Sequence, residues 1–111
     1  MPETETTIAA GRPGITLINI FTVAESRQNA LVTALDEATT EIFAHIPGFI
    51  SANVHASLDR TRVVNYAQWT DLDAYEEMLR RPEVRAHMLE VMGIAHTADP
   101  RLYTVRSVHR P

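Results

Sequence analysis

The order in which apolar residues repeat along the chain limits its possible folds more than any other feature. Four segments show the alternating or β-branched pattern that is typical of strands: residues 15–23, 49–58, 62–70 and 101–109. Three segments repeat at helical spacing instead: residues 26–46, 71–80 and a run from Pro82 to about Gly93. The order β-α-β-β-α-α-β predicts an α+β protein of the ferredoxin-like, split βαβ class with an antiparallel sheet.

Turn and capping signals give the expected boundaries of these elements. Pro47-Gly48 is expected to end the first helix, and Asp59-Arg60-Thr61 to join the second and third strands in a hairpin. Thr70 and Asp73 resemble a capping box at the start of the second helix. The helices that follow are expected to point these residues inward: Leu72, Tyr75, Met78, Leu79, Val84, Met88, Val91 and Met92.

The open face of such a sheet has a consequence for assembly. Helices cover only one face in this fold class, and Ile50 and Val54 on the second strand would add a large apolar area to the other face. Packing two sheets face to face would remove this area from water. The sequence therefore predicts a homodimer, arranged as a dimeric α+β barrel.

Composition and charge exclude several classes of function. We expect residues 1–13 to be a disordered tail and residues 14–111 to form a single domain. A net charge of −4 argues against a nucleic-acid partner, and the absence of cysteine excludes disulfides and thiolate chemistry. The chain shows neither a signal-peptide pattern nor an apolar run of about 18 residues, so we expect a cytoplasmic protein without a membrane span.

The segment "VVNYAQW", residues 63–69, contains an unexpected amide. Alternation along a strand puts Asn65 and Trp69 on one face, with only Ala67 between them. The simpler interpretation is a core tryptophan beside a structural asparagine. If this face lines a cavity, however, Asn65 and Asn19 of the first strand would offer directional hydrogen bonds to a buried polar ligand. Each amide left unpaired in the core would cost about 1–3 kcal/mol.

Three further side chains could take part in chemistry. Tyr75 is expected to point inward, where its hydroxyl needs a partner. His87 lies beside the apolar face of the last helix, and His55 lies on the more polar face of the second strand. The simpler interpretations are a core tyrosine, a surface or supporting histidine for His87, and an exposed or interfacial one for His55. The sequence has no dinucleotide or phosphate loop, no GxSxG elbow and no metal-ligand spacing of histidines.

Residues 47–79, "PGFISANVHASLDRTRVVNYAQWTDLDAYEEML", resemble the antibiotic biosynthesis monooxygenase family, and most of all its anthrone-oxidising members. The resemblance lies in "HAS", in "VVNYAQW" and in the tyrosine six residues after the tryptophan, and the element order extends it to about residues 14–109. It implies a dimeric α+β barrel that oxygenates tricyclic aromatic polyketides of the anthrone type to quinones. The co-substrate would be O2, with no flavin, haem or metal cofactor.

The resemblance also implies roles for individual residues. It assigns catalysis to Asn65, Trp69 and Tyr75. It assigns substrate binding to Asn19 and His55. Members of the family carry an arginine on the last helix that faces the pocket, and here that position falls near Met88 or Met92. Arg85 or His87 is therefore expected to take its place.

Two other functions stay open at this point. A haem-degrading oxygenase of the same superfamily would resemble this chain at Asn19 and would use His87 as the axial ligand. Such enzymes, however, carry a bulky tryptophan where this sequence has Met78. A non-catalytic ligand-binding dimer in a polyketide pathway is the second alternative, because fold does not fix function.

Overall fold

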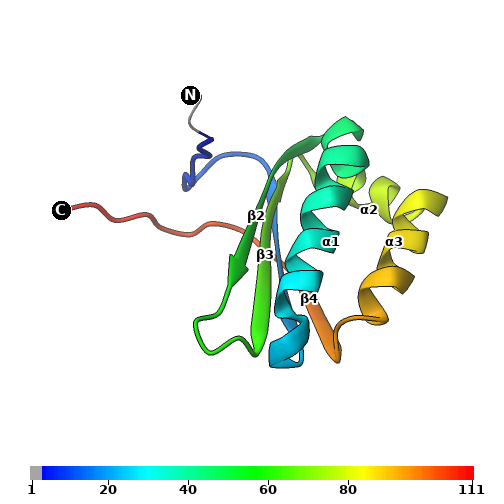
Figure 1. Cartoon of the computed structure of the whole chain (residues 1–111). Helices are drawn as coiled ribbons and strands as arrows, with labels where there is room; N and C mark the ends of the chain where they lie inside the picture. Colours follow the sequence, from blue (N-terminus) through cyan, green and yellow to red (C-terminus); the bar gives the residue numbers. More distant parts are fainter. Residues whose placement is uncertain (1–3) are drawn as a thin grey trace.

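The computed structural model describes residues 4–111 and shows a four-stranded antiparallel sheet with its helices on one face (Figure 1). The strands are β1 (Ile15–Thr22), β2 (Phe49–Ala56), β3 (Arg62–Trp69) and β4 (Thr97–Tyr103), in the spatial order β2-β3-β1-β4. The helices are α1 (Gln28–Glu41), α2 (Leu72–Leu79) and α3 (Pro82–Met92). The ferredoxin-like prediction is confirmed.

The first helical segment is shorter than its apolar pattern suggested. Two 3-10 turns, η1 (Glu25–Arg27) and η2 (Phe43–His45), flank α1 in place of one continuous helix over residues 26–46. The break falls at Ile42, whose φ of −120° and ψ of −68° leave the helical region. Because apolar spacing continues through the turn, the pattern could not show where the helix ended.

The α2 helix begins through a different cap from the expected one. The Asp71 carboxylate accepts a hydrogen bond from the Ala74 backbone N–H at 2.7 Å, so Asp71 is the N-cap and the Thr70–Asp73 capping box was wrong. Leu72 follows this cap and is exposed, whereas Tyr75 and Met78 are buried as expected. Pro82 occupies the first turn of α3 as predicted.

The fourth strand lies earlier in the chain than predicted. It spans Thr97–Tyr103, not 101–109, and it includes Asp99 and Pro100, which precede the predicted strand. β4 is an edge strand of the sheet, where a proline is tolerated, and Pro100 lies opposite Asn19 of β1. Residues 104–111 continue as an extended arm on the side away from the helices (Figure 1).

A register shift between Phe49 and Ser51 changes which residues of β2 face the helices. Phe49 pairs with Trp69 and packs against the core, while Ile50 is 51% exposed. Val54 packs against the core on the helical side, so its assignment to the open face was wrong. The apolar residues that β1 and β3 direct to the open face are instead half-buried: Ile18, Ile20, Val64 and Tyr66.

Part of the N-terminal segment contacts the open face. The Thr6 hydroxyl donates to Gln68 Oε1 at 2.7 Å, and Gln68 Nε2 donates to the Thr7 carbonyl at 2.9 Å. A disordered tail was expected over residues 1–13. Residues 1–3 lie outside the described part of the chain, and these two hydrogen bonds attach the segment after them to β3.

Candidate active site

Two groups of buried apolar residues form the core, and the polar site lies between them. One group is Leu17, Ile46, Ala67, Trp69, Tyr75, Met78 and Val84. The other is Phe21, Val23, Leu31, Leu35, Val63, Val91 and Ala95. Along β1, Asn19 separates Leu17 of the first group from Phe21 of the second. Along β3, Asn65 separates Ala67 from Val63 in the same way.

Asn19 and Asn65, the amide pair, are direct neighbours across two strands. The β1–β3 register places their Cα atoms opposite each other, so both side chains point into the layer between sheet and helices. The Oδ1 atom of each is buried and has no hydrogen-bond partner among the described residues. Buried polar atoms are normally paired, and each orphan costs about 1–3 kcal/mol. Two adjacent orphans indicate a place for a polar ligand.

Trp69 adds a third unpartnered group to the same wall. The residue is 2% exposed, and its Nε1–H has no acceptor among the described residues. Phe49 and Tyr75 hold the indole edge-to-face, with ring centroids 5.6 and 6.3 Å from it. Burial raises the pKa of the Tyr75 hydroxyl, so this group stays protonated and able to donate.

His87 on α3 lies on the helical wall of the site. It is 8% exposed, and its ring packs edge-to-face on Phe43, with centroids 5.6 Å apart. Burial lowers the pKa of His87 below its ordinary value of 6.5, and the nearby Glu90 carboxylate opposes this shift. The imidazole is therefore neutral at pH 7. Its inward position follows from helical spacing, because Val84 and Val91 are buried three residues before and four residues after it.

These side chains surround one cavity of about 240 Å³ between the sheet and the three helices. At roughly 30 Å³ per water molecule this space holds about eight waters, well beyond a packing defect. Apolar side chains form most of its wall. Met88 and Met92, expected to be fully inward, line the cavity and yet are 43% and 46% exposed. They therefore form its rim.

Sequence reasoning missed several lining residues. They are Thr39, Phe43, Phe49, Ala98 and Pro100. Ala98 and Pro100 escaped because β4 was placed too late in the chain. Phe49 could not be assigned because only the register shift in β2 turns it inward. Thr39 and Phe43 lie on apolar or neutral faces of α1 and η2 that carry no signal for a ligand.

Known proteins similar to this chain show its family. The sequence model described as "Antibiotic biosynthesis monooxygenase" matches residues 14–89, more than half of the chain. The chain belongs to this family. It is 38% identical over 81 residues to the tetracenomycin-F1 monooxygenase of Streptomyces glaucescens, which covers 73% of this chain and 72% of that protein. The antibiotic biosynthesis monooxygenases that it matches include polyketide-pathway enzymes.

Two solved structures of the family share the fold. The monooxygenase from the gene ActVA-Orf6 of Streptomyces coelicolor, in complex with nanaomycin D, superposes with a TM-score of 0.77 at 30% identity over 90% of this chain and 94% of its own. SnoaB from Streptomyces nogalater, a cofactor-independent oxygenase, superposes with a TM-score of 0.73 at 28% identity. The match covers 86% of this chain and 96% of the SnoaB chain. These relatives support an oxidoreductase activity for this member of the family.

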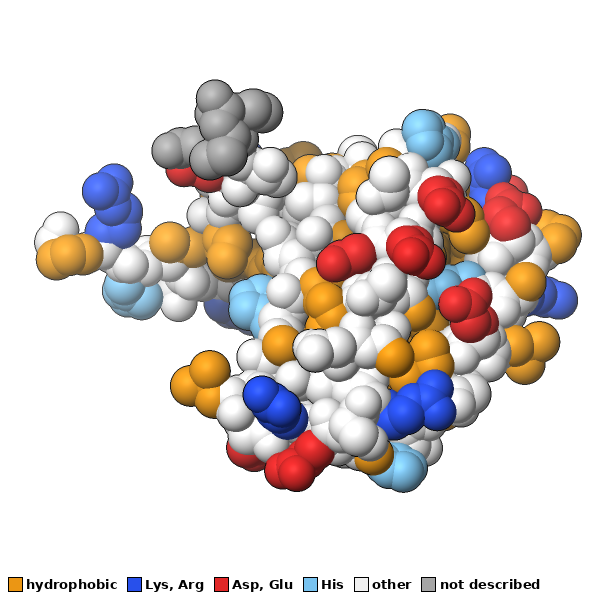
Figure 2. Space-filling view, viewed as in Figure 1, with side chains coloured by type: hydrophobic (Ala, Val, Ile, Leu, Met, Phe, Trp, Pro, Cys, Tyr) orange, Lys and Arg blue, Asp and Glu red, His pale blue; other side chains and the backbone are white. Residues whose placement is uncertain are grey.

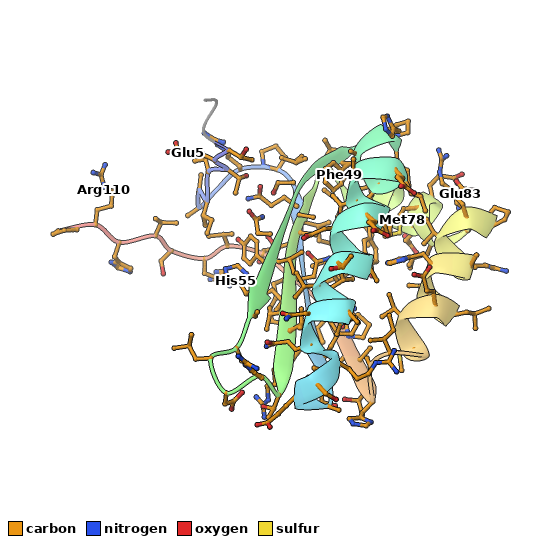
Figure 3. The ribbon with its side chains drawn as sticks, viewed as in Figure 1. Glu5, Phe49, His55, Met78, Glu83 and Arg110 are labelled. Carbon is orange, nitrogen blue, oxygen red and sulfur yellow. The ribbon has the colours of Figure 1, made fainter. Side chains whose placement is uncertain are left out.

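Two residues expected at the family's site lie elsewhere. His55 is exposed and lies on the face of β2 away from the helices, where its Nδ1 is 3.1 Å from the Asn53 carbonyl oxygen (Figure 3). Arg85 is exposed on α3 and does not line the cavity. In the same view Met78 lies on the helical side of the sheet, within the layer that contains the cavity. Neither His55 nor Arg85 is among the residues that line this cavity.

Outside this cavity, a second hollow of about 420 Å³ lies between the N-terminal segment and the sheet, and Arg12, Ile50 and Gln68 are among the residues that line it. Acidic side chains are scattered over the helical layer, with hydrophobic ones showing between them (Figure 2). Within residues 4–111, no three His, Asp or Glu residues gather as metal ligands would. In the same range, no helix combines the length and apolarity of a membrane span.

Proposed function

We propose that this protein is a cofactor-free monooxygenase that oxidises a tricyclic, anthrone-type aromatic polyketide to a quinone with O2. The observation that carries the proposal is the set of unpartnered polar atoms. Three of the four buried side-chain atoms without a partner, among the described residues, belong to Asn19, Asn65 and Trp69, which all line the cavity. A flat aromatic ligand would fill the apolar space, its phenol hydroxyls would donate to the two Oδ1 atoms, and a carbonyl oxygen would accept from the Trp69 Nε1–H.

The chemistry of an anthrone suits a site with this composition. Its central ring carries a carbonyl opposite an acidic CH2 group, and loss of a proton from CH2 gives a delocalised carbanion. This carbanion passes one electron to O2, and the two radicals combine as a peroxide. Loss of water then leaves a second carbonyl. One O2 accepts all four electrons, because one oxygen atom becomes the quinone carbonyl and the other leaves as water.

The protein would contribute charge stabilisation and a dry environment. The Asn65 amide, the Trp69 Nε1–H and the protonated Tyr75 hydroxyl are fixed donors for an oxygen atom that becomes negative on deprotonation. The Asn19 amide, beside Asn65, would hold a neighbouring phenol or carbonyl of the ligand. The apolar walls exclude water from the carbanion and hold the tricycle in place.

We also propose a homodimer formed through the open face of the sheet. The half-buried residues Ile18, Ile20 and Val64 of the two central strands lie on this face. A second copy would bury the same patch on both subunits, as two-fold symmetry requires. Light scattering is expected to give about twice the monomer mass of 12.4 kDa. A stable monomer at micromolar concentration would contradict this arrangement.

Oxygen uptake with anthrone tests the proposed reaction. Protein treated with a chelator and checked for flavin and haem is mixed with anthrone in an oxygen electrode while quinone absorbance is followed. One O2 consumed per quinone formed, above the autoxidation rate, supports the proposal. No uptake, combined with tight binding of the product, would indicate a binding protein. A Soret band on adding hemin, with haem loss under reductant, would indicate the haem-degrading alternative.

A further inference from the structure

We infer that His87 is the catalytic base of this site and removes the proton from the CH2 group of the bound anthrone. The inference rests on the proposed function and adds to it the group that starts the reaction. The hydrogen-bonding groups considered so far stabilise negative charge, and they do not accept a proton. A reaction that begins with loss of a proton needs an acceptor within the cavity.

Two of the donors, Asn65 and Trp69, lie on the opposite wall of the cavity from this acceptor. Asn65 and Trp69 belong to β3 in the sheet, whereas His87 belongs to α3 in the helical layer that covers it. In an anthrone the carbonyl and the CH2 group likewise lie at opposite ends of the central ring. A substrate whose carbonyl points to the sheet therefore presents its CH2 group to the helical wall, where the imidazole lies.

No other side chain in the cavity fits the role. Among the described residues that line it, Tyr75 is the only other titratable one, and its raised pKa keeps it protonated. His55 and Arg85 lie outside the cavity. Glu90, the one charged neighbour that acts on His87, is exposed on the same helix. The sheet, α1, η2 and α2 contribute only uncharged side chains to the lining, so the imidazole has no competing acid or base there.

The step is a proton transfer without oxidation. A lone pair on an imidazole nitrogen forms the new N–H bond as the C–H bond breaks. The C–H electron pair moves into the ring system and onto the carbonyl oxygen, which the Asn65 amide and the Trp69 Nε1–H hold. Imidazolium and carbanion then lie close together in an apolar space. The proton can later return to the peroxide oxygen and leave with it as water.

Hydrogen exchange without oxygen isolates this step. Anthrone deuterated at CH2 is incubated anaerobically in ordinary water with the protein, and loss of deuterium is followed by mass spectrometry against the buffer rate. We expect wild type to accelerate exchange and H87Q to lower the enzymatic rate about 10²-fold or more, within the range of general-base contributions. H96Q, which changes an exposed histidine outside the cavity, is the matched control.

Two further readouts separate a base from a structural residue. Added imidazole is expected to restore exchange to H87A, and wild-type exchange is expected to fall on acidification with a midpoint below pH 6.5. The assignment would be overturned if H87Q exchanged deuterium as fast as wild type, or if imidazole gave no rescue and the wild-type rate showed no pH midpoint. Oxygen uptake by wild type would still support the proposed function in that case. Failure of wild type in both exchange and uptake would instead reject the proposed function itself. If H87Q does not fold, the rescue and the pH midpoint decide.

Discussion

Replacing Asn65 by leucine should change stability and activity in opposite directions. Leucine is close to asparagine in length and removes a buried Oδ1 that has no partner among the described residues. An unsatisfied buried group costs about 1–3 kcal/mol, so the free energy of unfolding should rise by about this amount. At about 4 °C per kcal/mol for a domain of this size, the melting temperature should rise by about 4–12 °C.

Turnover of the same variant should fall. The Asn65 amide is a fixed donor to the oxygen that gains charge, and loss of one such donor typically lowers kcat by about 10²–10³-fold. Melting is measured by calorimetry at one protein concentration, since assembly affects the midpoint. Activity is measured as quinone formation from anthrone, corrected for autoxidation.

Asn53→Leu is the matched control, one strand away on the opposite face. The Asn53 Nδ2 donates to Ser51 Oγ at 3.1 Å and to the Tyr66 carbonyl at 2.9 Å, so this amide is already paired. Loss of these two hydrogen bonds, at about 0.5–1.5 kcal/mol each, should lower the free energy of unfolding by about 1–3 kcal/mol. The kcat should stay unchanged. An Asn65→Leu variant that is less stable than wild type and fully active would refute the idea that the site holds an unpaired amide for a ligand.

Three other perturbations test the structure at the site and away from it. Gly48→Ala should lower the free energy of unfolding by about 2 kcal/mol or more, because φ is +90° at this position and an added Cβ would clash with the Ala74 Cβ. Urea unfolding measures this loss, and an unchanged midpoint would contradict the geometry. Hydrogen bonds from Thr61 and Ser57 lower the pKa of Asp59 to about 2, so its contribution is present above pH 3.8 and is lost as the pH falls towards 2. Asp59→Asn should therefore lose less stability than wild type over that range, as measured by denaturation at several pH values. The pKa of His87 is lowered in the folded protein, so on acidification the unfolded chain takes up a proton at this residue first, and the free energy of unfolding falls below pH 6.5. H87Q should lack this part of the pH dependence. Equal slopes of unfolding free energy against pH in H87Q and wild type would count against a neutral buried imidazole.

Local periodicity was sufficient to predict much of the fold and part of the site. A period of two placed Asn65 and Trp69 on one face of β3, and a helical period placed His87 with Val84 and Val91. The same periodicity failed where the backbone departs from regular repeats. The shift in β2 turned Phe49 inward and exposed Ile50, and the edge position of β4 accommodated Pro100, before the start of the predicted strand.

The sequence by itself determined the element order, the family and the identity of the polar side chains on inward faces, because these depend on neighbours a few residues apart. Only the tertiary structure decided that Asn19 and Asn65 lie opposite each other, since strand register is a property of two segments more than 40 residues apart in the chain. It likewise decided that His55 and Arg85 lie outside the cavity and that His87 lies within it. A binding site depends on which faces meet across the layers, and packing of the whole domain fixes that choice.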